Sequence, residues 1–134
     1  MNPTEITIGV DFDGTCVTNE YPLIGKSIGA ESFLRALGKQ GIKLCLWTCR
    51  TGDELKQAVD WFKQNNIPLY GVNDNPKYMS WSSGRKVFFD LVIDDISVGI
   101  PLIPNTVKPI VDWQRLAPEL LLRIIELRKQ KNIT

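Results

Sequence analysis

The sequence predicts an α/β fold in which helices connect the strands of a parallel β-sheet. Short apolar runs rich in β-branched residues alternate along the chain with segments of helical period. Acidic or hydroxyl side chains follow three of these runs, and ligands of parallel sheets bind beyond the carboxyl ends of the strands. Because the chain has 134 residues, of which 43% are hydrophobic, we expect one domain over residues 1–134 with its own core.

Four strands are predicted, at residues 6–10, 42–47, 68–72 and 87–93. Each is an apolar run of strand length, and the third is the weakest. The first run is followed by Asp11, the second by Thr48 and the fourth by Asp94 and Asp95. Right-handed helical crossovers make such strands parallel, so these polar side chains are expected at one edge of the sheet.

Three helices are predicted from apolar residues that recur at helical spacing. The first connects the first two strands, ends near Gly41 and has the apolar positions Ala30, Phe33, Leu34 and Leu37. The second follows Asp53 and Glu54 and has the apolar positions Leu55, Ala58, Val59 and Phe62. The third is expected to begin at Pro118 and to present Leu120, Leu121, Ile124, Ile125 and Leu127 to the sheet. With helices on both faces, the sheet would form a three-layer Rossmann-like fold.

Charge and composition exclude several classes of function. The chain carries 16 Lys and Arg against 15 Asp and Glu, a net charge of +1, which does not favour a dedicated nucleic-acid-binding protein. It contains no histidine, which excludes Ser-His-Asp and Cys-His catalysis and HExxH zinc sites. Its three cysteines match no CxxC pattern and are expected to be reduced thiols. Because neither a signal-peptide pattern nor a membrane-spanning apolar run is present, a cytoplasmic protein is expected.

The most specific motif is Asp11-Phe12-Asp13-Gly14-Thr15, at the end of the first predicted strand. In an extended chain, residues i and i+2 point to the same side roughly 6.5 Å apart, so the two carboxylates share a face while Phe12 turns into the core. Gly14 allows a sharp turn, and Thr15 offers a hydroxyl. A hydrated cation and a phosphoryl group would fit between these carboxylates. The structural alternative is an Asp-Gly turn that closes a hairpin.

This motif resembles the first motif of the haloacid dehalogenase (HAD) superfamily of Mg²⁺-dependent phosphotransferases. The segment 46–48 is similar to the second motif, a lysine before the fourth strand to the third, and the segment 92–95 to the fourth. The resemblance extends over most of the chain and implies a HAD-like fold. The segments between the motifs leave no room for the cap domains of many members, so a capless protein with an open site is expected.

The resemblance implies a phosphatase that works through an aspartyl-phosphate. Asp11 would be the nucleophile, and Asp13 would protonate the leaving oxygen and then take a proton from water. Mg²⁺ is the implied cofactor, and it favours about six oxygen ligands near 2.1 Å. The first choices as ligands are Asp11 and Asp94, followed by Asp95 and the backbone carbonyl of Asp13.

The residues expected to bind the substrate phosphate are Gly14, Thr48, Arg50 and Lys77. Thr48 would hydrogen-bond a phosphate oxygen, or else bond only backbone groups. Arg50 would reach the same phosphate, or pair with Asp53 on the surface. The catalytic lysine of the superfamily is assigned to Lys86, directly before the fourth strand, and Lys77 is the alternative.

The expected partner is a phosphorylated substrate, either a small molecule or an exposed phosphate on a larger one. The segments 18–29 and 73–84 are expected to form the rims of the site. No membrane partner is expected, nucleic acid is not favoured, and a homo-oligomer whose second subunit closes the site is left open. Three alternatives remain: a nucleotidase or polynucleotide phosphatase of the same superfamily, a non-catalytic phospho-acceptor module similar to response-regulator receivers, and a degenerate binding protein.

Overall fold

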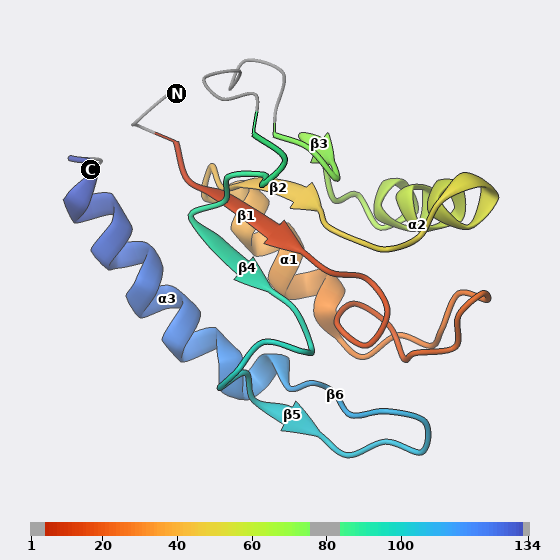
Figure 1. Ribbon diagram of the computed structural model, residues 1–134. Helices are drawn as coiled ribbons and strands as arrows, with labels where there is room; N and C mark the ends of the chain where they lie inside the picture. The colour runs from red at the N-terminus through yellow and green to blue at the C-terminus, as the bar shows by residue number, and fades with distance from the viewer. Residues whose placement is uncertain (1–4, 76–83, 133–134) are drawn as a thin grey trace.

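A four-stranded parallel sheet lies at the centre of the protein, in the order β3-β2-β1-β4 (Figure 1). The structure is a computed structural model that describes residues 5–75 and 84–132. The strands are β1 (Thr7–Val10), β2 (Lys43–Leu46), β3 (Gly71–Val72) and β4 (Leu91–Ile93). Helix α1 (Ala30–Lys39) connects β1 to β2, and α2 (Gly52–Gln64) connects β2 to β3. The predicted α/β class and parallel sheet are therefore confirmed.

Strand β1 pairs with a neighbour on each side. Its last residue, Val10, lies opposite Leu46 of β2 and Ile93 of β4. All four β1 residues are buried, as is typical of a central parallel strand, whose sequence reads as a continuous apolar run. The residues that follow these three strand ends therefore emerge together at one edge of the sheet.

Helices α1 and α2 bury most of the predicted apolar positions. The buried residues are Ala30, Leu34 and Leu37 of α1 and Ala58 and Phe62 of α2. Phe12, the residue after the first aspartate, packs edge-on against Trp61 with ring centroids 5.5 Å apart and also contacts Phe62. The aromatic residue between the two aspartates thus anchors the loop after β1 to helix α2, as the alternation of side chains predicts.

The C-terminal helix α3 (Trp113–Gln130) begins before Pro118, which is a correction to the predicted start. The side chain of Asp112 accepts a hydrogen bond from the backbone N–H of Arg115 at 3.2 Å and caps the helix. Pro118 lies inside the helix. The buried face is also narrower than predicted, since Leu120 and Ile124 are buried while Leu121 and Ile125 are exposed.

The third and fourth strands are shorter than predicted, because side chains and loops replace part of the ladder. The backbone N–H of Thr7 donates to the carboxylate of Asp90 at 2.9 Å, just before β4 begins. Lys131 pairs with the other oxygen of that carboxylate at 3.1 Å. In β3, only Gly71 and Val72 pair regularly with β2.

A two-stranded antiparallel hairpin, β5 (Leu102–Ile103) with β6 (Ile110–Val111), follows β4 and was not predicted. It lies beyond the tips of β1 and β4 in Figure 1. Val111 donates its N–H to the carbonyl of Gly14 at 2.9 Å. The indole N–H of Trp113 donates to the carbonyl of Thr15 at 2.7 Å. The hairpin and the first residue of α3 thus hold the loop that follows β1.

The predicted arrangement of helices on both faces of the sheet is not confirmed. The ring of Phe89 packs directly against Gly9 of β1. A Cβ built on Gly9 would lie 2.6 Å from that ring. One buried apolar cluster includes residues of β1, β2 and β4 and of the helices α1, α2 and α3.

No helix in the described part of the chain is long and apolar enough to cross a membrane. The cytoplasmic location stays a prediction.

Candidate functional site

Three aspartates converge at the carboxyl edge of the sheet. Asp11 follows β1, and Asp94 and Asp95 follow the neighbouring strand β4. The backbone N–H of Asp11 donates to the carbonyl of Ile93 at 2.9 Å and ties the two strand ends together. One carboxylate oxygen of each aspartate lies within 4.8 Å of the other two. The predicted meeting of acidic residues from both ends of the sequence is confirmed.

The hydroxyl of Thr15 holds this cluster in place. It donates to one carboxylate oxygen of Asp11 at 2.8 Å and accepts from the backbone N–H of Asp95 at 3.0 Å. The side chain is fully buried, so water does not compete for either bond. A single hydroxyl therefore fixes the nucleophile candidate of β1 relative to the acidic pair of β4.

Gly14 provides space for Asp95, and its predicted role in binding phosphate stays a prediction. It is buried and has a φ of +84°, in the left-handed region. A Cβ built on Gly14 would lie 2.5 Å from a carboxylate oxygen of Asp95. Any larger residue would therefore displace the carboxylate of Asp95 from the acidic cluster.

We expect Gly14→Ala to destabilise the protein by about 1–3 kcal/mol and to weaken binding of divalent cations, because it combines left-handed strain with a clash at Asp95. Gly99→Ala is the matched control, since Gly99 has a φ of +86° with open space around it. The control should show only the backbone cost of about 1 kcal/mol. Urea unfolding and the Mg²⁺-induced rise in Tm measure both effects. Equal effects of the two substitutions on cation binding would contradict this role of Gly14.

Crowding of the carboxylates changes their acidity. Burial, followed by the charge of Asp94, raises the pKa of Asp11 to about 8, although the hydrogen bond from Thr15 acts in the opposite direction. Burial, followed by a hydrogen bond with Asp94, also raises the pKa of Asp95. The cluster therefore resists full ionisation unless a positive charge joins it.

The donor set fits a small divalent cation. Two oxygen ligands of one Mg²⁺ lie at most about 4.2 Å apart, twice the usual ligand distance. The three carboxylate oxygens, within 4.8 Å of one another, need only small side-chain rotations to meet that limit. Carboxylates are also the ligands that Mg²⁺ prefers.

The side chain of Asp13, which was predicted to act as acid and base, is not part of this cluster. The predicted metal ligand of this residue is its backbone carbonyl, and that stays a prediction. Both of its carboxylate oxygens accept hydrogen bonds from Arg50, from Nε at 2.8 Å and from an Nη at 2.7 Å. The pair is a two-pronged salt bridge of the kind that guanidinium and carboxylate groups form best. Asp13 still lines the cavity above the cluster.

Arg50 is buried, and neither of its two predicted roles describes its contacts. Only 2% of it is exposed. Its remaining N–H groups donate to the carbonyls of Pro22, Leu23 and Glu54 at 2.7–3.3 Å. Its guanidinium carbon lies 5.0 Å from the ring centre of Phe12 and 5.2 Å from that of Tyr21. With every N–H group engaged, Arg50 has no donor left for a phosphate. It pairs with Asp13 rather than with Asp53.

Two cavities open onto the acidic cluster. One, of about 440 Å³, is lined by the predicted residues Asp11, Asp13, Thr48, Arg50, Asp94 and Asp95, together with Asn19, Tyr21, Cys49, Ile96 and Lys108. The other, of about 500 Å³, shares Asp11, Thr48, Cys49, Asp94 and Ile96 and adds Trp47 and Asn73. Tyr21 confirms the segment 18–29 as one rim of the site.

Thr48 lies where the two cavities meet. Its hydroxyl accepts a hydrogen bond from the backbone N–H of Arg50 at 3.1 Å. Its own backbone N–H donates to the side chain of Asn73 at 2.8 Å. The hydroxyl proton remains available to an oxygen in the cavity, because a hydroxyl can accept and donate at the same time. The predicted bonds of Thr48 to neighbouring groups are therefore present, and its role in binding a phosphate oxygen stays a prediction.

The structure does not place the predicted lysines in the site. Lys86 is exposed and lines neither cavity. Lys77 lies outside the described residues, as do Tyr78 and Trp81 of the predicted second rim. Lys108, in the connection between β5 and β6, does line the cavity with the acidic cluster. Sequence reasoning missed it because the short hairpin strands leave no periodic signal.

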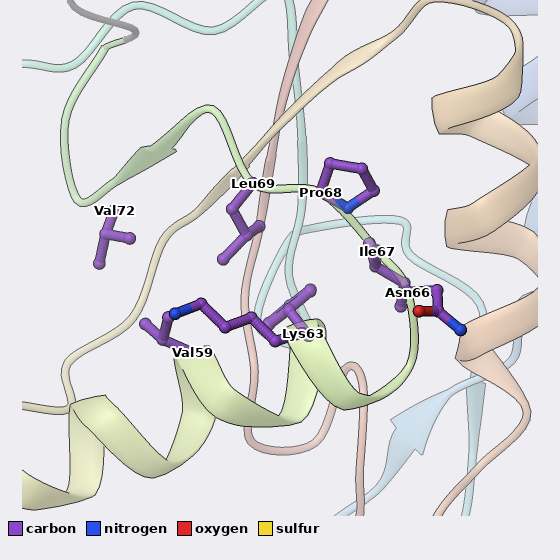
Figure 2. A pocket seen from close by; sticks show the side chains of 8 residues that line it. Val59, Lys63, Asn66, Ile67, Pro68, Leu69 and Val72 are labelled. Atoms are coloured by element: carbon purple, nitrogen blue, oxygen red, sulfur yellow. The ribbon is translucent and has the colours of Figure 1, made fainter.

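A separate cavity of about 540 Å³ lies beside α2 and β3 (Figure 2). It is lined by Val59, Phe62, Lys63, Asn66, Ile67, Pro68, Leu69 and Val72. The described residues that form its walls are mostly apolar, and none of them carries a carboxylate, thiol or hydroxyl group. It therefore lacks the chemistry of the acidic edge of the sheet.

Comparison with known proteins identifies a relative. The chain is similar to a solved structure described as a conserved protein from Bacteroides thetaiotaomicron, with 33% sequence identity and a TM-score of 0.73. The match covers 89% of this chain and 92% of that chain. No family model and no curated protein matches the sequence. Its identity and coverage show that this chain belongs to the same protein family as the conserved Bacteroides thetaiotaomicron protein.

Proposed function

We propose that this protein is a Mg²⁺-dependent phosphomonoester hydrolase that works through an aspartyl-phosphate on Asp11. The observation that carries the proposal is the convergence of Asp11, Asp94 and Asp95 on the wall of an open cavity. The HAD-like classification of the fold belongs to the same proposal. It is supported by the order of the motifs along the chain and by the parallel sheet on which they lie.

Asp11 is the nucleophile in this proposal because, within the acidic cluster, its carboxylate is the one that the buried hydroxyl of Thr15 orients. Thr15 holds one of its oxygens, so the side chain presents its other oxygen in a fixed direction. Mg²⁺, when bound by Asp11, Asp94 and Asp95, supplies the positive charge that brings a phosphate dianion next to carboxylates.

The other side chains of the cavity position the substrate. The Thr48 hydroxyl donates to a phosphate oxygen, and the ammonium group of Lys108, which lines the same cavity, offsets negative charge there. In the first step Asp11 attacks phosphorus and the leaving group departs. In the second step water attacks phosphorus and releases Asp11. Two displacements replace one slow direct attack by water.

We expect removal of divalent cations with EDTA to abolish hydrolysis and added Mg²⁺ to restore it, because the acidic cluster would repel a phosphate without a cation. A panel of aryl, sugar, nucleoside and acyl phosphates, assayed for phosphate release, measures this. Asp94→Asn should weaken the apparent Mg²⁺ affinity by about tenfold or more, since it removes one charged ligand. Asp53→Asn, in the exposed first turn of α2, is the control. Turnover that persists in EDTA would contradict the proposed function.

A further inference from the structure

Among the described residues that line the cavity above the acidic cluster, no carboxylate is free to protonate a leaving group. Four aspartates line it. Asp11, Asp94 and Asp95 form the candidate cation site. The fourth, Asp13, uses both oxygens to accept hydrogen bonds from Arg50. Asp13, which is the general acid that the superfamily resemblance implies, is therefore engaged in an ion pair with Arg50.

The surroundings of Arg50 make this ion pair hard to open. The guanidinium group is buried, and its central carbon lies 5.0 Å from the ring centre of Phe12 and 5.2 Å from that of Tyr21. Its other partners are backbone carbonyls, which carry no charge. Among the described residues, Asp13 is the carboxylate with which Arg50 forms a salt bridge. If Asp13 turned toward a substrate, a buried guanidinium would lose both its counter-charge and two acceptors.

We propose that the Arg50–Asp13 ion pair withholds Asp13 from the leaving group, so that this site selects phosphoryl donors whose leaving group departs as a stable anion, namely aryl and acyl phosphates. The inference rests on the phosphohydrolase function proposed above and specifies its substrate class. Arg50 is a positioning residue in this scheme, because it acts through Asp13 and has no donor left for the substrate.

The chemistry balances without a proton from the protein in the first step. The bond from Asp11 to phosphorus forms while the bond from phosphorus to the leaving oxygen breaks, and the leaving group takes the electron pair as a phenolate or carboxylate. Water then attacks phosphorus, the bond to Asp11 breaks, and the protons of that water pass to the phosphate product and to solvent. An unprotonated alkoxide is too poor a leaving group for this route. Alkyl phosphates should therefore lose the roughly 10²–10⁴-fold that general acid catalysis contributes.

The test is a leaving-group series with the wild-type protein and Mg²⁺. We expect kcat/KM for p-nitrophenyl phosphate and acetyl phosphate to exceed that for glycerol phosphate by about 10²-fold or more. Asp13→Asn should lower the rates for aryl and alkyl donors by a similar factor. Comparable wild-type rates for glycerol phosphate and p-nitrophenyl phosphate, or a loss in Asp13→Asn confined to glycerol phosphate, would overturn the inference. If no donor is turned over, the proposed function itself fails.

A second readout does not depend on turnover. The NMR signal of the Arg50 Nε–H group can be assigned because it is absent in Arg50→Lys. In the metal-free wild type, this proton should exchange slowly with solvent. It should stay protected when Mg²⁺ and beryllium fluoride, a mimic of the aspartyl-phosphate, are added. Rapid exchange after that addition would show that Asp13 has left Arg50 and would contradict the proposal. Arg50→Lys should also reduce the preference for aryl over alkyl donors. Should that variant fail to fold, the wild-type series and Asp13→Asn still decide the question.

Discussion

Asp11→Asn is expected to reduce phosphate release by about 10⁴-fold or more, as the loss of a covalent nucleophile does in other enzymes. An amide is a poor nucleophile and a poor ligand for Mg²⁺, so the substitution removes both proposed roles of Asp11. The fold should be retained, because Asn has the same shape and its oxygen can still accept the hydrogen bond from Thr15. Phosphate release from p-nitrophenyl phosphate and far-ultraviolet circular dichroism measure the two expectations.

The control for Asp11→Asn is Asp53→Asn, which makes the same chemical change on the exposed first turn of α2. It should retain the wild-type rate. Trapping of the phosphorylated protein provides a direct check, because hydroxylamine cleaves an acyl phosphate. Hydroxylamine-sensitive label should appear on the peptide that contains Asp11 in the wild type and be absent in Asp11→Asn. Retained hydrolysis in Asp11→Asn would show that another residue is the nucleophile.

The central part of the fold was predictable because its signals are local. The continuous apolar run of β1 and the helical spacing of Leu34 and Leu37 each arise from the burial of one element. Where prediction failed, long-range contacts decide the structure. The start of α3 depends on the Asp112 cap, and the short β4 depends on a contact between Thr7 and Asp90, 83 positions apart. The hairpin strands contain two residues each, too few for any period to show.

The candidate site, like the fold, has some parts that could be predicted from the sequence and others that could not. Asp11 and Asp94 could be brought together from sequence alone, because parallel neighbouring strands end at one edge of a sheet. The bond between Asp13 and Arg50 could not, because it depends on the path of two loops whose residues are 37 positions apart. Lys108 was missed because it lies between two strands of two residues each, which give no periodic signal. Motif spacing thus locates the charged atoms of the cluster, whereas the partners that restrain them come from loops without periodic signals.

The metal-free protein is expected to lose stability as pH rises from about 4 to about 8, by at most about 1.4 kcal/mol per pH unit for each proton that the folded state retains. The pKa of Asp11 is raised from 3.8 to about 8 in the folded protein. Between these values the folded state keeps a proton that the unfolded chain has released, so a rise in pH favours unfolding. A bound cation replaces that proton. Millimolar Mg²⁺ should therefore stabilise the protein more at about pH 8 than at about pH 5.

Urea unfolding in EDTA and in Mg²⁺, at about pH 5 and about pH 8, measures this linkage between protons and the cation. Asp11→Asn is the control, because an amide does not titrate and the fall in stability should largely disappear with it. The thiol of Cys45 does not confuse the result, since burial raises its pKa to about 11, above the range of the experiment. A metal-free protein whose free energy of unfolding rises between pH 5 and pH 8 would show that Asp11 ionises readily. In that case the three carboxylates could not be crowded as the structure places them, and the cation site would lose its physical basis.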